Sequence, residues 1–381
     1  MALPLFSERK GGPVLITISL CMIVRDEEEV LGRCLDSVGK IADEIIIVDT
    51  GSTDRTVEIA RRYTEKVYFF PWQDDFSAAR NFSFEKAGGD YCMWLDADDM
   101  IEDKDREKFL RLKETLSPDT DIVMMPYHTA FDQRGEPVFV FYRERLLRRK
   151  AGFRWQGFLH EAITPLGKIG YSDAAVSHRK LHVKDPERNL RIYEAHLAKG
   201  TPFSPRDWFY YGRELADRGQ YEKAERVLQD FLDSGQGWVE NCREACRYLY
   251  QCRKELGKKQ EALRGLLAGL SLGAPDGELC CLLGDWFLEE KNWETAAFWY
   301  ETALTRKPDA SSGGFVRTEY SGYIPALQLG LCRYYQGKVE EACRCNELAE
   351  NFRPEDPICR KNRAFYRSLG LPVSENRETD L

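Results

Sequence analysis

A series of short apolar segments, separated by segments with helical spacing, constrains the fold of the N-terminal half more than any other feature. Residues 14–24 (VLITISLCMIV) are almost continuously apolar, which is typical of a strand buried on both faces of a sheet. Similar strands are predicted at 44–50, 66–70 and 90–95, with helices at 29–40, 54–64 and 76–87. Because alternating strands and helices build covered parallel sheets, we expect an α/β domain with a mostly parallel, Rossmann-like central sheet.

A different pattern begins at residue 121. The segments 122–131 (IVMMPYHTAF) and 136–149 (EPVFVFYRERLLRR) look like strands of another kind. We expect them to extend the sheet and to close one side of a site at its edge.

The C-terminal half is helical from about residue 188, and its sequence repeats. Four segments fit one tetratricopeptide template. We therefore divide the chain into a tail (1–14), the α/β domain (15–187) and an all-α domain of about four tetratricopeptide-like repeats (188–381). Aromatic residues at helical spacing are usually core, so a partner-binding role or a homodimer through the repeats is only an option. The first repeat shows the template best, with Trp208, Tyr211, Gly212, Leu215, Gly219, Tyr221, Ala224 and Leu228.

The composition excludes several classes of protein. A formal net charge of −8 gives no general attraction to nucleic acid. We expect neither a signal peptide nor a transmembrane segment, because the most apolar stretch, 14–24, is far shorter than the ~20 residues of a membrane helix. The 12 cysteines include no C-x-x-C pair, which favours small apolar packing residues in a reduced, cytoplasmic protein.

Polar and acidic clusters follow three of the predicted strands. In parallel sheets ligands bind outside the carboxyl ends of the strands, so we expect these clusters to form the site. The three clusters are Arg25-Asp26-Glu27, Asp49-Thr50-Gly51-Ser52 and Asp96-Ala97-Asp98-Asp99.

Asp96 and Asp98 are two residues apart at a strand end, so both carboxylates can reach one ion or an adjoining ribose. Divalent hard cations take such oxygen ligands and neutralise the diphosphate of a nucleotide-sugar. A D-x-D alone is a weak signal. A calcium loop of the EF-hand type is excluded, because its sixth position, which requires glycine, is Ile101.

Asp49 ends the second strand, where its carboxylate can accept a hydrogen bond from a base N–H. The Gly51-Ser52 turn lets a ligand approach the backbone. A turn followed by a helix N-cap is an equally good interpretation of Ser52, Thr53 and Asp54.

Four segments together resemble glycosyltransferase family 2, which has the GT-A fold. They are SLCMIVRDEEEVLGRCLDSV, EIIIVDTGSTDRT, DDFSAARN and WLDADD, and the resemblance covers about residues 15–185. It implies an inverting transfer from a nucleoside-diphosphate sugar, often UDP-linked, with Mg2+ or Mn2+ as the cofactor.

The resemblance also implies roles for single residues. Asp49 would contact the base, and Arg80 would lie near the diphosphate or the D-x-D loop. Asp96 would contact the ribose or the sugar, and Asp98 would bind the metal. The remaining nucleotide-sugar-binding candidates are Arg25, Glu27 and Ser52.

The segment FRWQGFLHEAI resembles the family branch with C-terminal tetratricopeptide repeats, which includes S-glycosyltransferases of the sublancin type. An inverting transfer needs a base, and Glu161 is a suitable carboxylate. His160 could ligate the metal. The two side chains would point opposite ways in a regular strand, which favours a loop. The alternative is a buried structural histidine and a surface glutamate. The acidic pair that many family members carry on a later helix is missing, so the base is Glu161, lies elsewhere, or is dispensable for an acidic thiol acceptor.

Two further groups are weaker candidates. One of His178 and His182 could touch metal or phosphate, and one of Arg143, Arg145 and Arg148 could bind a phosphate oxygen, although solvated charge is the more frequent explanation for arginines.

We interpret the chain as an inverting glycosyltransferase that moves a hexose from a UDP-sugar to a peptide, protein or glycan. The alternative is a degenerate GT-A scaffold with a partner-binding repeat array, against which the intact Asp49, Arg80 and D-x-D speak. A nucleotidyltransferase would need a glycine-rich loop after the first strand, where the chain has VRDEEEV.

Overall fold

The computed structural model describes residues 15–132, 134–181, 185–307 and 314–372. The chain forms two compact units, one up to Tyr211 and one from Gly212 onward. The predicted tail at 1–14 lies outside the described residues. The division falls later than the boundary predicted at residue 187, because α5 (Arg188–Ala198) and the start of α6 (Pro205–Asp217) belong to the first unit.

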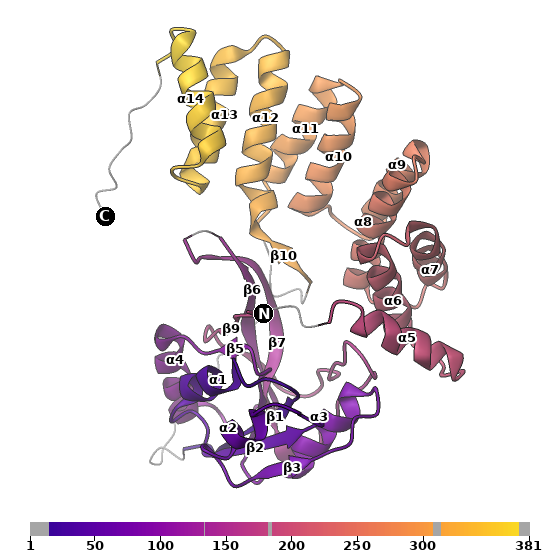
Figure 1. Ribbon diagram of the computed structural model, residues 1–381. Coiled ribbons are helices and arrows are strands. Elements are labelled where there is room, and N and C mark those ends of the chain that lie inside the picture. The colour runs from indigo at the N-terminus through magenta and orange to yellow at the C-terminus, as the bar shows by residue number, and fades with distance from the viewer. Residues whose placement is uncertain (1–14, 133, 182–184, 308–313, 373–381) are drawn as a thin grey trace. The chain divides into compact units, whose positions relative to one another are not determined.

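The first unit is built on one mixed sheet with the strand order β3-β2-β1-β4-β7-β6-β9-β5, and β8 also pairs with β6 (Figure 1). Strands β1 to β4 are mutually parallel, as predicted, whereas β7 runs antiparallel to both β4 and β6. The strands are β1 (Ile18–Val24), β2 (Glu44–Asp49), β3 (Val67–Phe69), β4 (Tyr91–Trp94), β5 (Asp99–Met100), β6 (Ile122–Phe131), β7 (Pro137–Arg148), β8 (Ile169–Tyr171) and β9 (Val176–His178).

Helices cover both faces of the parallel strands, which explains why β1 is apolar along nearly its whole length. Alternate β1 residues such as Leu20 and Met22 pack in one core with α1 (Leu31–Val38), α2 (Thr56–Ala60) and α4 (Asp103–Thr115). Residues of the opposite face, such as Cys21, pack with α3 (Phe76–Glu85). The carboxyl ends of β1, β2 and β4 are therefore left free of helices and carry the three polar clusters.

The predicted strands after residue 121 form the long hairpin of β6 and β7, joined to β4 through β7. The short strand β5 turns the chain back against β9, so that Asp99 lies opposite His178. This pairing brings a late segment of the unit to the end of β4.

The second unit consists of paired helices, in agreement with the predicted repeats. The pairs are α8–α9, α10–α11 and α12–α13, followed by α14 (Figure 1). Before them, Gly212 of α6 lies against Leu228 of α7. Small residues allow close packing, since a Cβ at Gly284 would lie 2.7 Å from the Tyr300 ring. Gly219, Gly257 and Gly337 take left-handed conformations at the turns between paired helices. The bounds are α7 (Tyr221–Asp233), α8 (Val239–Glu255), α9 (Lys259–Leu270), α10 (Gly277–Glu289), α11 (Trp293–Leu304), α12 (Tyr323–Tyr335), α13 (Val339–Phe352) and α14 (Pro357–Ser368).

Within the described residues, no helix has both the length and the apolar character needed to span a membrane. Most of the cysteines are buried as free thiols in the cores of the two units.

Candidate active site

The D-x-D segment forms a tight turn directly after β4. The Asp99 N–H donates to the Asp96 carbonyl, and the Asp96 N–H donates to Asp99 Oδ2, each over 3.0 Å. The Arg179 N–H donates to the Asp98 carbonyl over 2.9 Å. These bonds fix the backbone of the turn that carries Asp96 and Asp98.

Asp98, Asp99 and His178 form a group whose potential ligand atoms all lie within 4.8 Å of one another. His178 Nδ1 is 3.3 Å from Asp98 Oδ1 and 3.2 Å from Asp99 Oδ1. Burial raises the pKa of Asp98, His178 opposes that rise, and Asp96 adds to it. Burial lowers the pKa of His178, but the hydrogen bond to Asp99 and the charge of Asp98 outweigh this effect and leave it raised.

Asp99 is fully buried and already engaged on both oxygens. Oδ1 accepts from the Tyr127 hydroxyl over 2.7 Å, and Oδ2 lies 3.3 Å from Arg145 Nη1. Asp98 and His178, each about one-fifth exposed, are the better ligands for a hard divalent cation. The donor set fits such an ion if the diphosphate of the donor completes its coordination.

Arg80 connects the D-x-D turn to the segment that carries Glu161. Its Nη2 donates to Asp96 Oδ1 over 2.6 Å, and its Nε donates to Glu161 Oε1 over 2.5 Å. The guanidinium is 8% exposed and lies 5.0 Å from the Trp94 ring and 4.9 Å from the Trp155 ring. Burial alone would raise the pKa of Asp96, but the charge of Arg80 lowers it to about 2.

Helix α3 places Arg80 because its first turn and its central residues are both anchored. The Asp75 carboxylate caps the helix by accepting from the Ala78 N–H. Asn81 exchanges two hydrogen bonds of 2.9 and 3.0 Å with the backbone of Trp155. The S-A-A-R-N sequence thus fastens α3 to the segment before Glu161.

Residues 157–161 form a loop, which we call the 157–161 loop. Two backbone hydrogen bonds between Gln156 and Ala162 close it. Glu161 ends this loop with its side chain on Arg80, 10% exposed. The segment is a loop, as the opposite directions of His160 and Glu161 in a strand had suggested.

His160 lies away from the ligand group. Its ring is stacked on Tyr210 with centroids 4.1 Å apart, and its backbone is left-handed, with φ of 49°. Among the described residues, the structure gathers Asp98 with His178 and Asp99, and His160 is no member of that group. The ligand role of His160 stays a prediction that this geometry does not favour. His182 lies outside the described residues.

Asp49 and Ser52 hold their own turn together. Asp49 is 6% exposed and accepts from the Gly51 and Ser52 N–H groups, and Ser52 Oγ accepts from the Asp26 N–H over 2.9 Å. The contacts of Ser52 are therefore those of a residue that stabilises a turn. Arg25 is exposed, and Glu27 is half-buried at the start of α1.

Arg145 corrects the expectation of solvated charge. Its side chain is fully buried, donates to the Trp94 carbonyl, and lies 3.8 Å from the Trp94 ring and 4.3 Å from the Tyr127 ring. The sequence reasoning also missed Tyr127 and Asp99 as supports of the turn. The only available signal was that Asp99 adjoins the D-x-D motif.

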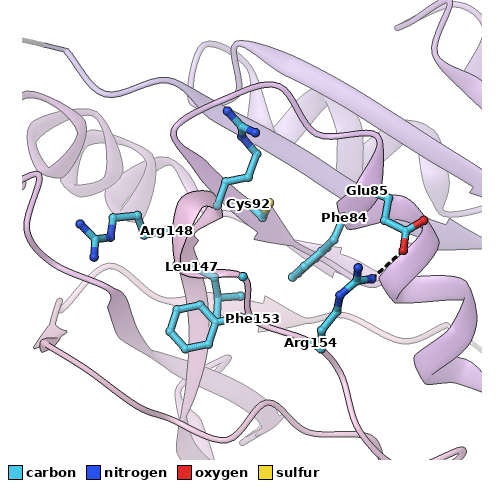
Figure 2. A pocket seen from close by; sticks show the side chains of 9 residues that line it. Phe84, Glu85, Cys92, Leu147, Arg148, Phe153 and Arg154 are labelled. Carbon is cyan, nitrogen blue, oxygen red and sulfur yellow. Dashed lines mark hydrogen bonds and ion pairs between the residues drawn. The ribbon is translucent and has the colours of Figure 1, made fainter.

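A pocket of about 110 Å³ lies elsewhere, at the opposite end of β4 (Figure 2). Arg154 on its rim pairs with Glu85 over 2.6 Å, as the dashed line shows. Apart from Arg148, one of the weaker candidates for a phosphate contact, none of the residues that line it is a predicted site residue, and the pocket is small for a nucleotide-sugar.

Comparisons with known proteins find relatives that cover much of this chain. The model of glycosyl transferase family 2 matches residues 19–165. A TPR repeat-containing protein of Synechococcus elongatus is 33% identical over 329 residues, which cover 84% of this chain and 74% of that protein.

Two relatives named as glycosyltransferases are also similar. The lipopolysaccharide core biosynthesis glycosyltransferase LpsC of Rhizobium meliloti is 30% identical over 166 residues, covering 41% of this chain and 60% of LpsC. The prophage-derived glycosyltransferase SunS of Bacillus subtilis is 27% identical over 240 residues, covering 57% of this chain and 54% of SunS. The chain thus spans less than two thirds of both of these relatives.

Proposed function

The chain belongs to glycosyltransferase family 2, in a form with C-terminal tetratricopeptide repeats, and from this premise we propose that it transfers a hexose from a UDP-sugar with inversion and with Mg2+ or Mn2+. The proposed acceptor is a peptide, a protein or a glycan. The observation that carries the proposal is the convergence of Asp96, Asp98, Arg80 and Glu161 at one edge of the sheet.

The donor would lie across the ends of β1, β2 and β4. Asp49, at the end of β2, is the proposed contact of the base, and one of its oxygens can accept a bifurcated bond while it also holds the turn. Arg25, Glu27 and Ser52 would line the same end. Asp96 is the proposed contact of the ribose or the sugar, because its side chain is 36% exposed although Arg80 holds one oxygen.

Asp98 and His178 would hold the cation, and the Asp99 carboxylate contacts the His178 ring and the Asp96 N–H of the turn. A bound cation would neutralise the diphosphate and stabilise it as the leaving group. His178 replaces His160 in this proposal, because His178 is the histidine whose Nδ1 faces Asp98.

Glu161 is the proposed base. Its carboxylate is held in place by an ion pair with the buried Arg80 guanidinium. The acceptor would attack the anomeric carbon from the face opposite the diphosphate, and its proton would pass to the Glu161 carboxylate. Arg80 holds both the proposed base and the proposed donor contact Asp96 on one rigid guanidinium, so that donor and base are oriented together.

The experiment is a donor screen followed by product analysis. The full chain would be incubated with UDP-sugars and Mn2+, and release of UDP would be measured with peptide and glycan acceptors. We expect one UDP-sugar to be turned over, and the mass of the product to rise by one hexose on one acceptor class. Absence of turnover with every UDP-sugar, alongside turnover of another nucleotide-sugar, would contradict the choice of UDP. A product of retained anomeric configuration would contradict the inverting mechanism.

A further inference from the structure

The 157–161 loop is held from two sides. On the side of α3, Asn81 binds the backbone of Trp155, and the Phe76 N–H donates to the Phe158 carbonyl over 2.8 Å. On the side of α6, Arg206 Nε donates to the His160 carbonyl over 2.9 Å. The loop therefore bridges the helix that carries Arg80 and a helix about 130 residues further along the chain.

Arg206 and Tyr210 are four residues apart on α6 and so lie on one face of the helix. The Arg206 guanidinium lies 4.8 Å from the Tyr210 ring centroid and donates to the Tyr210 hydroxyl over 3.3 Å. Tyr210 also stacks on His160, whose ring is almost parallel to it, with an interplanar angle of 13°. Both α6 residues therefore contact His160: Arg206 donates to the His160 carbonyl, and the Tyr210 ring stacks on the His160 ring.

The backbone of His160 has an uncommon conformation. The φ of His160 is 49°, a left-handed value that is uncommon in residues other than glycine. The conformation of residue 160 sets the direction in which the next side chain leaves the chain. That next side chain is Glu161, which meets Arg80 over 2.5 Å.

We propose that Tyr210 and Arg206 are positioning residues, which hold His160 in its left-handed conformation and thereby fix the Glu161 carboxylate on Arg80. The imidazole of His160 serves as a stacking surface and not as a metal ligand. This inference rests on the proposed function, because Glu161 is the base there. It makes the first helix of the repeats a part of the active-site support.

The test is a double-mutant cycle on the full chain. Tyr210→Leu keeps a buried apolar side chain but loses the stack, and we expect kcat to fall about 10- to 100-fold, as for a displaced catalytic group, with the KM for the UDP-sugar unchanged. In the Glu161→Gln background the same substitution should lower kcat less than about twofold, because it acts through Glu161. The matched control is Tyr210→Phe, which keeps the ring and should retain kcat within about threefold of the wild type.

Equal factors in the two backgrounds would overturn the proposal, because Tyr210 would then act independently of Glu161. A Glu161→Gln variant as active as the wild type would also overturn the proposal, because Glu161 would then not be the base. If the wild-type chain turns over no nucleotide-sugar at all, the proposed function fails. Failure of the positioning proposal is different, because the wild type then turns over its donor and only the ratios between variants depart from the expectation.

A second pair of variants works even if Tyr210→Leu does not fold. His160→Phe keeps the stacked ring but has no nitrogen, whereas His160→Ala loses the stack. We expect His160→Phe to retain kcat within about tenfold of the wild type, with the same Mn2+ dependence, and to exceed His160→Ala. Equal loss in both variants, with a raised Mn2+ requirement, would show that the imidazole itself binds metal.

Discussion

Two buried arginines, Arg80 in the first unit and Arg247 in the second, both bind carboxylates on more than one side. Arg247 binds Glu244, Asp276 and Glu278, and Arg317 binds two of the same carboxylates. These carboxylates belong to helices or their caps, since Asp276 accepts from the Leu279 N–H at the start of α10. The Arg247 network therefore ties helices of the repeats together.

Arg80 binds carboxylates that lie outside regular elements, one on the D-x-D turn and one on the 157–161 loop. The rings of Trp94 and Trp155 also lie against its guanidinium. The side chains of the two arginines are similarly buried, 8% and 11% exposed, so burial does not distinguish them. Their positions distinguish them: Arg80 lies at the carboxyl edge of the parallel strands, where sheets of this kind bind ligands, whereas Arg247 lies between helices.

The largest effect should come from Asp98→Asn. The substitution keeps the shape of the side chain but removes the charge that would hold the cation. We expect the rate of sugar transfer with Mn2+ to fall at least about 100-fold, since even residues that only support a ligand cost about 10- to 100-fold. The thermal unfolding temperature should stay within a few degrees of the wild type, in contrast to a change in the Arg247 network. An active Asp98→Asn variant would remove Asp98 from the metal site.

The same substitution at the two arginines separates their roles. Lysine keeps the charge but loses the planar fork that binds two carboxylates. Arg80→Lys should lower kcat about 100-fold because donor contact and base are no longer held together. Arg247→Lys should leave the kcat of the folded protein within about twofold and lower the free energy of unfolding by about 2 kcal/mol. Steady-state kinetics and urea unfolding of both variants check the pair. An Arg247→Lys variant that loses activity without losing stability would contradict the comparison.

Glu161→Gln tests the base directly. Glutamine can still accept from Arg80 Nε, so the loop should stay in place. We expect kcat to fall about 100-fold, the lower range for loss of a general base, while the affinity for UDP stays unchanged. Pre-steady-state and binding measurements distinguish the two quantities. Equal losses in kcat and in affinity would assign Glu161 a structural role.

A smaller effect concerns pH. Arg80 lowers the pKa of Asp96 to about 2 against the opposing effect of burial, from an ordinary value of 3.8. A carboxyl with a depressed folded-state pKa stabilises the fold above its unfolded pKa, and this contribution is lost as pH falls towards 2. The difference in unfolding free energy between the wild type and Asp96→Asn should therefore be constant from pH 7 to about 5 and shrink below about pH 4. Urea unfolding across this range measures it, and a difference that grows on acidification would have the wrong sign.

The sequence predicted most of the fold because its signals are local. The apolar run of β1, the alternation of helices and strands and the repeat template are all visible within short windows. The same local signals placed Asp49, Asp96 and Asp98 at strand ends. Local signals could not place the boundary between the two units inside α6. A helix has the same periodicity whichever unit it packs on.

The contacts within the site were less predictable because they join distant segments. Arg80 meets Asp96 across 16 residues and Glu161 across 81 residues. His178 reaches Asp98 through the pairing of β5 and β9, and β5 is a two-residue strand too short to show a periodicity. Arg145 was expected in solvent because charges alternate along its strand. That pattern does not reveal that the Arg145 guanidinium packs on the Trp94 ring.

The central claim is that the carboxyl edge of the sheet is a metal-dependent nucleotide site, and calorimetric titration of the full chain with UDP tests it most directly. With Mn2+ present, we expect the wild type and the Arg247→Lys variant to bind UDP with the same affinity, and the Asp98→Asn variant to bind at least about tenfold more weakly. Without Mn2+, the wild type should bind as weakly as Asp98→Asn. Equal affinity of the wild type with and without Mn2+, or the absence of UDP binding in both conditions, would contradict the account.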